Sequence, residues 1–132
     1  MEIEVSTEKG LRPISVMHVN GNIDSATSQK FQSKAEELIT AGARDILVDL
    51  THVYFVSSAG VRAILATFNK LRDLSPDVSD EDMRKGINNG TYKSLHLKLL
   101  NPSKETITTF NMTGLDMYID IYTDLKTAVS SF

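Results

Sequence analysis

Asp45-Ile-Leu-Val-Asp-Leu50 and Val53-Tyr-Phe-Val-Ser-Ser-Ala-Gly60 are the two neighbouring stretches that decide the fold. The first is a short, nearly continuous apolar run, which is typical of a strand covered on both faces. Beyond the second, apolar residues recur with helical spacing at Val61, Ile64, Leu65, Phe68 and Leu71. A buried strand followed by an amphipathic helix predicts a βα unit of a parallel sheet.

Other strand-like runs occur on both sides of this unit. Ile14–Val19 is rich in β-branched residues. Ile3 and Val5 predict an earlier edge strand, joined to Ile14–Val19 by a turn around Glu8-Lys9-Gly10. Leu95–Leu100 and Tyr118–Tyr122 predict two later strands.

Helical patterns separate these strands. Asp24 and Ser25 are candidate N-caps for a helix that ends before Gly42, with an apolar face formed by Phe31, Ala35, Leu38 and Ile39. A short helix is expected over Lys104–Asn111, closed by Gly114, and a terminal helix over 125–132. The predicted order is β-β-α-β-α-β-α-β-α. The expected fold class is therefore a single α/β domain with a mixed sheet of about five strands, one antiparallel hairpin and about four helices.

Composition and net charge argue against several classes of function. The 132 residues carry a net charge of −3 and no cysteine. Without a basic excess, we expect binding neither to nucleic acid nor to an anionic membrane surface. The N-terminus lacks the pattern of a signal peptide, and no apolar run approaches the roughly 20 residues that span a bilayer, so a cytoplasmic location is predicted.

The segment Ser75–Ser94 differs in character from the rest. It is rich in acidic and turn-forming residues, including Asp77, Asp80 and Asn88-Asn89-Gly90. We interpret it as a solvated loop insertion, with one short helical turn at Glu81–Lys85.

Few residues carry catalytic or metal-binding patterns. His18, His52 and His96 are far apart, and none has the spacing of a metal site. No glycine-rich phosphate loop and no G-x-S-x-G motif occurs. The sequence therefore predicts neither a cofactor nor a metal, and a binding protein rather than an enzyme.

Ser57-Ser58, at the predicted strand-to-helix turn, has two interpretations. A serine at a helix start commonly caps the helix, and this reading needs no function. The same position projects at the carboxyl end of the sheet, where open α/β folds bind ligands and partners. Phosphorylation there would add about −1.5 to −2 charges, which a helix N-terminus tolerates. A docked partner would then meet a hydrated dianion.

Several motifs, in this order and spacing, resemble the STAS domain family, and more closely its anti-sigma factor antagonists. The motifs are Gly21-Asn-Ile-Asp24, Asp45–Leu50, Val53–Leu65, Leu97–Asn101, Phe110-Asn-Met-Thr-Gly-Leu115 and Ile119-Asp-Ile-Tyr122. The resemblance extends over nearly the whole chain except Ser75–Ser94. The resemblance implies one STAS domain over residues 1–132.

The resemblance also implies a mechanism. In this family, an anti-sigma factor that is also a serine kinase phosphorylates a serine that corresponds to Ser58. The unphosphorylated antagonist binds the anti-sigma factor and releases the sigma factor, and a separate serine phosphatase resets the phosphorylated form. We expect a cytoplasmic monomer, with a weak dimer as the alternative. Its partner-binding surface would include Asp24, Ser57, Ser58, Ala59, Gly60 and Arg62.

This sequence departs from the family pattern at the site. Ser57 stands where the family often has Asp, and Ala59 where it has a second hydroxyl residue. Ser57 is thus a second candidate for phosphorylation, and a STAS scaffold without phosphorylation remains an alternative function. An aspartyl-phosphate receiver centred on Asp49 is a weaker alternative, because no acidic pair for magnesium and no strand-end lysine accompany that residue.

Overall fold

The structure is a computed structural model that describes residues 1–74 and 94–132. Its first half contains β1 (Glu2–Lys9), β2 (Pro13–Asn20), α1 (Ser28–Thr40), β3 (Ile46–His52) and α2 (Ser58–Leu74). Its second half contains β4 (Leu97–Leu100), α4 (Lys104–Thr113), the 3-10 turn η1 (Leu115–Met117), β5 (Ile121–Tyr122) and α5 (Leu125–Ser130). The predicted order of strands and α-helices is confirmed for the described residues.

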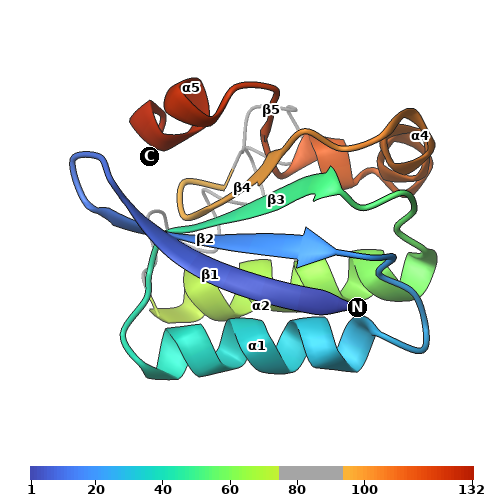
Figure 1. Cartoon of the computed structure of the whole chain (residues 1–132), viewed down its shortest axis with the longest axis horizontal. Coiled ribbons are helices and arrows are strands. Elements are labelled where there is room, and N and C mark those ends of the chain that lie inside the picture. Colours follow the sequence, from blue (N-terminus) through green and yellow to red (C-terminus); the bar gives the residue numbers. More distant parts are fainter. Residues whose placement is uncertain (75–93) are drawn as a thin grey trace.

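One five-stranded sheet, in the order β1-β2-β3-β4-β5, organises the chain (Figure 1). β1 pairs antiparallel with β2, and every later pair is parallel, with Met17 opposite Val48 and Val48 opposite Leu99 at the centre. The carboxyl ends of β2, β3, β4 and β5 therefore meet at one edge of the sheet. This edge is where the candidate site lies.

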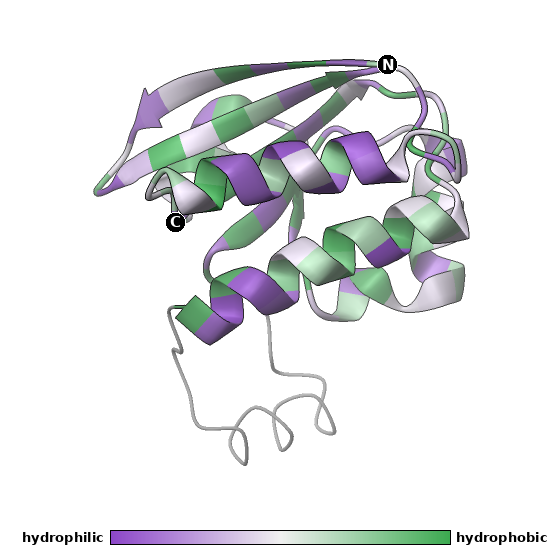
Figure 2. Ribbon diagram, turned by 90° about the horizontal axis from the view of Figure 1, so that it is seen from below, coloured by the Kyte–Doolittle hydropathy of each residue, from purple (hydrophilic) through white to green (hydrophobic). Residues whose placement is uncertain are grey.

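The two faces of the sheet are covered unequally. α1 and α2 lie side by side under one face, and α5 lies on the other (Figure 1). Hydrophilic and hydrophobic residues alternate along α1 and α2 (Figure 2), and the buried ones include Phe31 of α1 and Ile64 of α2. The main core lies on the α1–α2 face and includes Met17, Phe31, Val48, Ile64 and Leu99, all fully buried. Burial of this apolar surface is the main stabilising term of the domain.

The smaller core under α5 holds a buried lysine. Lys98, on β4, is only 4% exposed although its side chain is charged. Its ammonium donates a hydrogen bond to the Ser131 carbonyl (2.9 Å) and lies 5.6 Å and 5.2 Å from the ring centroids of Tyr122 and Phe132. These contacts offset the cost of burying the charge and tie the end of the chain to the sheet.

The start of α1 corrects one prediction. The helix begins at Ser28 with Thr27 at the N-cap position, so neither Asp24 nor Ser25 caps it. The Asp24 side chain instead accepts hydrogen bonds from the Ala26 and Thr27 amides (2.9 and 3.2 Å), which closes a turn ahead of the helix. The predicted end is confirmed, because Gly42 follows the last turn with φ +111°.

Strand lengths also differ from the predictions. β1 and β2 are longer than predicted, while β4 and β5 are shorter, and β5 has only two residues. Leu95 and His96 form a bend before β4, and η1 occupies the connection that leads to β5. The predicted insertion lies outside the described residues apart from Ser94, which is buried and accepts a hydrogen bond from the Leu97 amide (3.0 Å).

Candidate functional site

The β3–α2 turn is held against the end of β2 by a short parallel bridge between Ile23 and Val56. The Ile23 amide donates to the Phe55 carbonyl (3.1 Å), and the Ser57 amide donates to the Ile23 carbonyl (2.9 Å). The Asn22 side-chain oxygen also accepts from the Phe55 amide (3.0 Å). The bridge therefore brings two segments that are 33 residues apart in sequence to the same edge of the sheet.

Gly60 permits this close approach. A Cβ atom at Gly60 would lie 2.5 Å from the Ile23 carbonyl oxygen and 2.7 Å from a methyl group of Val56. Contacts below 3.0 Å are essentially never made by real Cβ atoms. Only glycine therefore lets the first turn of α2 pack on the Ile23 backbone. Gly60 is buried, so we assign it a packing role within the site.

The two serines of the turn have different roles. Ser57 precedes α2, and its Oγ accepts a hydrogen bond from the Gly60 amide (3.3 Å), as an N-cap side chain does. Its carbonyl accepts from the Val61 amide (2.9 Å). Ser58 is the first residue of α2 and is exposed, and its hydroxyl has no hydrogen-bond partner among the described residues. Capping thus accounts for Ser57 and leaves the Ser58 hydroxyl open to solvent.

The other predicted site residues lie nearby but differ in accessibility. Asp24 directly follows the bridge residue Ile23 and is half-buried, with its carboxylate engaged by the turn before α1. Arg62 is exposed one turn after Ser58, on the same side of α2. Ala59 is half-buried. The structure thus places every predicted residue at one edge of the sheet, and Ser58 and Arg62 are the exposed members.

Two aromatic side chains next to the turn were not among the predicted site residues. Tyr54 is 67% exposed and Phe55 is 38% exposed, both just ahead of Ser57. The Tyr54 carbonyl accepts a hydrogen bond from Ser103 Oγ (2.6 Å), which fixes this loop to the start of α4. Exposed aromatic rings on a fixed loop are favourable anchors for a protein partner. The sequence signal for these two residues was their position in the connection between the predicted strand Asp45–Leu50 and the Ser57-Ser58 turn, rather than in a strand.

A second group of polar residues lies on the α5 side of the sheet, away from the serine turn. Ser6 Oγ and His18 Nε2 are 2.8 Å apart, and His18 Nδ1 and Asp49 Oδ2 are 2.8 Å apart. Burial by itself raises the pKa of Asp49. Hydrogen bonds from the Thr51 hydroxyl, the Thr51 amide and His18 lower it by more, so the pKa lies below its usual value. Asp49 is therefore ionised near neutral pH. The sequence did not reveal this array, because its members lie on three separate strands.

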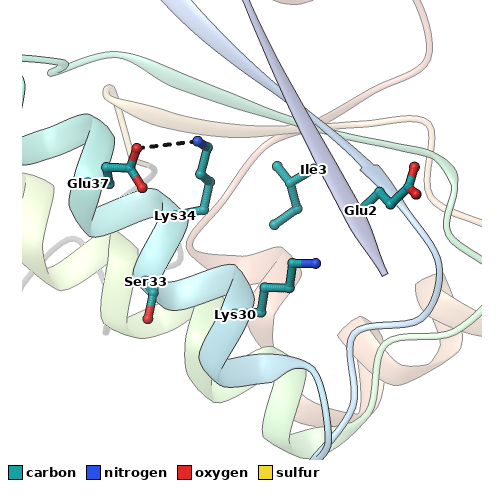
Figure 3. Close-up of a pocket in the computed structure, with 6 residues that line it drawn as sticks. All are labelled: Glu2, Ile3, Lys30, Ser33, Lys34 and Glu37. Atoms are coloured by element: carbon teal, nitrogen blue, oxygen red, sulfur yellow. Dashed lines mark hydrogen bonds and ion pairs between the residues drawn. The ribbon is translucent and has the colours of Figure 1, made fainter.

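The hollow between β1 and α1 has a volume of about 420 Å³ and is shown in Figure 3. Its lining consists of Glu2, Ile3, Lys30, Ser33, Lys34 and Glu37. Both lysines already have partners, since Lys34 pairs with Glu37 (3.4 Å) and Lys30 donates to the Met1 carbonyl (2.6 Å). We assign no ligand to it.

Within residues 1–74 and 94–132, no three His, Cys, Asp or Glu side chains are placed to hold a metal ion. No helix in the same ranges has the length and apolar character required to cross a membrane.

Solved structures of similar fold identify the architecture of the domain. An anti-sigma factor antagonist from Mycobacterium paratuberculosis is 19% identical, with a TM-score of 0.68 over 98% of this chain and 93% of its own. The unphosphorylated anti-sigma factor antagonist SpoIIAA is 20% identical, with a TM-score of 0.67 over 96% and 93% of the chains. Its phosphorylated form from Bacillus has a TM-score of 0.60 at 20% identity and 96% coverage of both chains. At these identities the likeness establishes a SpoIIAA-like fold.

The family follows from the sequence model. The STAS domain model matches residues 3–78, which is more than half of the chain, so the protein belongs to the STAS domain family. Among curated protein sequences, none matches the chain closely enough to count as a relative.

Proposed function

We propose that this protein is an anti-sigma factor antagonist that binds an anti-sigma factor with serine kinase activity and is switched off by phosphorylation of Ser58. The observation that carries the proposal is the exposed Ser58 hydroxyl on the first turn of α2, at the carboxyl edge of the sheet. A kinase can reach this hydroxyl without unfolding the domain. The family and the SpoIIAA-like fold support the same reading.

The choice of Ser58 over Ser57 rests on hydrogen bonding. Ser57 Oγ accepts from the Gly60 amide, so its modification would remove the cap of α2. A phosphate on Ser58 would instead lie beside the amide groups of the first turn, where negative charge is favourable. Phosphorylated Ser58 therefore leaves the fold intact and changes only the surface potential. We retain Ser57 as the second candidate acceptor.

The docking surface proposed here comprises Asp24, Ser57, Ser58, Ala59 and Arg62, extended by Tyr54 and Phe55, and the buried Gly60 supports it from beneath. Partner contact with the aromatic rings would desolvate the turn. A dianion placed there would lose its hydration without gaining a paired charge, which opposes docking. We also propose that the protein is a cytoplasmic monomer, that a serine phosphatase resets it, and that residues 75–94 are an insertion in one STAS domain.

The direct test incubates the protein with ATP and the serine kinase encoded nearest to it in its genome, and maps the phosphate by mass spectrometry. We expect one phosphate on Ser58 in the wild type, and its loss in Ser58→Ala while Ser57→Ala is still modified. Phosphate found only outside these two serines, or none at all, would refute the switch.

A constitutive STAS scaffold is the second candidate, and Ser57 in the place of the family's usual Asp favours it. A scaffold would self-assemble and would bind its partners irrespective of phosphate. Size-exclusion chromatography with light scattering separates the two functions. A monomer is expected for the switch, and a stable higher assembly would favour the scaffold.

A further inference from the structure

The Ser6–His18–Asp49 array joins three adjacent strands on the α5 side of the sheet. Ser6 belongs to β1, His18 to β2 and Asp49 to β3. Register explains the contact, because Val16 faces Ser6, Glu4 faces His18, and His18 faces Asp49. Each side chain therefore points to the same face, and His18 bridges the other two.

The order of atoms is that of a serine activated by a general base. One imidazole nitrogen, Nε2, lies 2.8 Å from Ser6 Oγ, and the other, Nδ1, lies 2.8 Å from Asp49 Oδ2. An ionised Asp49 accepts a hydrogen bond from His18 Nδ1–H, which keeps the proton on Nδ1 and leaves the Nε2 lone pair free to take the serine proton. Asp49 is itself oriented by the Thr51 amide (3.0 Å) and the Thr51 hydroxyl. His18 is thus within hydrogen-bond reach of both the nucleophile Ser6 and the orienting carboxylate of Asp49.

The array is accessible from solvent. The His18 side chain is 38% exposed, the Asp49 side chain is 15% exposed, and Ser6 is half-buried. A cavity of about 110 Å³ adjoins His18 and is lined by Glu2, Glu4, His18, Val19, Asn20 and His52. Neither Ser6 nor Asp49 lines this cavity, so it adjoins the array through His18 alone. Glu4 lies opposite His18 in the strand register, and its charge together with that of Glu2 gives a negative field that disfavours anionic reagents.

We propose that Ser6 is an acyl-acceptor serine, activated by His18 and Asp49, which takes an acyl group from an uncharged activated ester. Ser6 Oγ attacks the ester carbonyl carbon as its proton passes to His18 Nε2. The bond to the leaving alkoxide breaks, and the alkoxide takes that proton from His18. The products are one O-acyl serine and one alcohol. Water supplies the hydrogen bonds to the transient oxyanion, so the reaction is slower than in an enzyme with an oxyanion hole.

The alternative is a cross-strand hydrogen-bond ladder that only stabilises the edge strand β1. This structural role requires the same contacts but gives no covalent product. The decisive observable is therefore an ester on Ser6. Formation of this ester does not depend on phosphorylation of Ser58, so the acylation proposal and the proposed function can each fail without the other.

The experiment treats the full chain with p-nitrophenyl acetate and follows p-nitrophenolate release, then maps acetyl groups by mass spectrometry. Hydroxylamine treatment separates the serine ester from amides on lysines and the N-terminus. We expect one acetyl ester on Ser6. Ser33 is the matched control, since it is an exposed serine hydrogen-bonded to Gln29 and not to an imidazole. It should stay unmodified, and Ser33→Ala should react like the wild type.

Two substitutions test the activation. His18→Gln should slow acetylation of Ser6 by about 100-fold, the usual size of general-base assistance. Asp49→Asn should slow it as well, because the amide would donate to Nδ1 and leave Nε2 protonated. Circular dichroism and thermal melts establish that each variant is folded. No ester on Ser6, or equal rates in folded wild type and His18→Gln, would overturn the proposal.

A charge comparison tests the class of acyl donor. A ring-sulfonated nitrophenyl acetate of matched intrinsic reactivity should acetylate Ser6 more slowly than the uncharged ester, and added salt should reduce the difference. Equal rates at low salt would refute the preference for uncharged donors.

Discussion

The β3–α2 turn and the Ser6–His18–Asp49 array each present a serine, but they surround it differently. Ser58 has an exposed hydroxyl with no partner in the described part of the chain, at the start of a helix. Ser6 lies within a sheet and is hydrogen-bonded to an imidazole. Under the proposed function, the Ser58 hydroxyl depends on a separate kinase for its modification, and the start of the helix is a favourable place for a phosphate. The Ser6 hydroxyl has its base built into the neighbouring strands.

The largest expected effect is a loss of stability, caused by disrupting the packing of the β3–α2 turn on the Ile23 backbone. Gly60→Ala would place a methyl group 2.5 Å from the Ile23 carbonyl oxygen, so the start of α2 must shift. We expect a loss of about 3 kcal/mol in the free energy of unfolding, as in an overpacked core. Urea titration measures it.

Gly42→Ala is the control for Gly60→Ala. No atom lies within 4 Å of a Cβ at Gly42, so only the strain of its φ of +111° remains. We expect it to cost about 1 kcal/mol. Equal costs at the two positions would contradict the close approach at Gly60.

The next effect concerns partner binding. Ser58→Asp should weaken binding of the anti-sigma factor by well over 1 kcal/mol, because it adds a charge to a desolvated contact. Ser58→Asn has nearly the same shape without the charge and should bind more tightly than Ser58→Asp. Isothermal titration calorimetry compares the affinities. Equal affinities for the two variants would exclude an electrostatic block.

A smaller effect separates the two neighbouring serines. Ser57→Ala should lower the free energy of unfolding by about 1 kcal/mol, since it removes the side-chain cap on the Gly60 amide. Ser58→Ala should change it by less than about 0.5 kcal/mol, as for an exposed surface position. Chemical denaturation of both variants provides the comparison. The reverse ranking would show that Ser58 caps the helix.

The smallest effect is the pH dependence of the strand array. The folded-state pKa of Asp49 lies below its usual value, so the ionised carboxylate stabilises the fold above about pH 4. This contribution is lost as the pH falls through the folded-state pKa. The difference in melting temperature between wild type and Asp49→Asn should therefore be largest near neutral pH and shrink in acid. A difference that stays constant with pH would contradict the assignment.

Local patterns predicted much of the fold because they depend on neighbours in sequence. Helical spacing placed Phe31, Ile64 and Phe68 in the core, where they are buried. Ser103 caps α4 and Gly114 ends it with φ +78°, as turn chemistry predicts. The burial of Lys98 lies outside what such patterns predict. Its side chain is covered by α5 and two aromatic rings, which are contacts between segments distant in sequence.

The same distinction between local patterns and tertiary contacts applies to the candidate sites. The sequence by itself determined the order of strands and helices along the chain, the helix that follows Ser57-Ser58 and the family, since these are carried by periodicity and short motifs. Tertiary structure alone decided that Ser57 caps while Ser58 is exposed, that Gly60 packs on Ile23, and that Ser6, His18 and Asp49 meet. The physical reason is that these contacts depend on strand register and on the approach of segments distant in sequence, which no local pattern encodes.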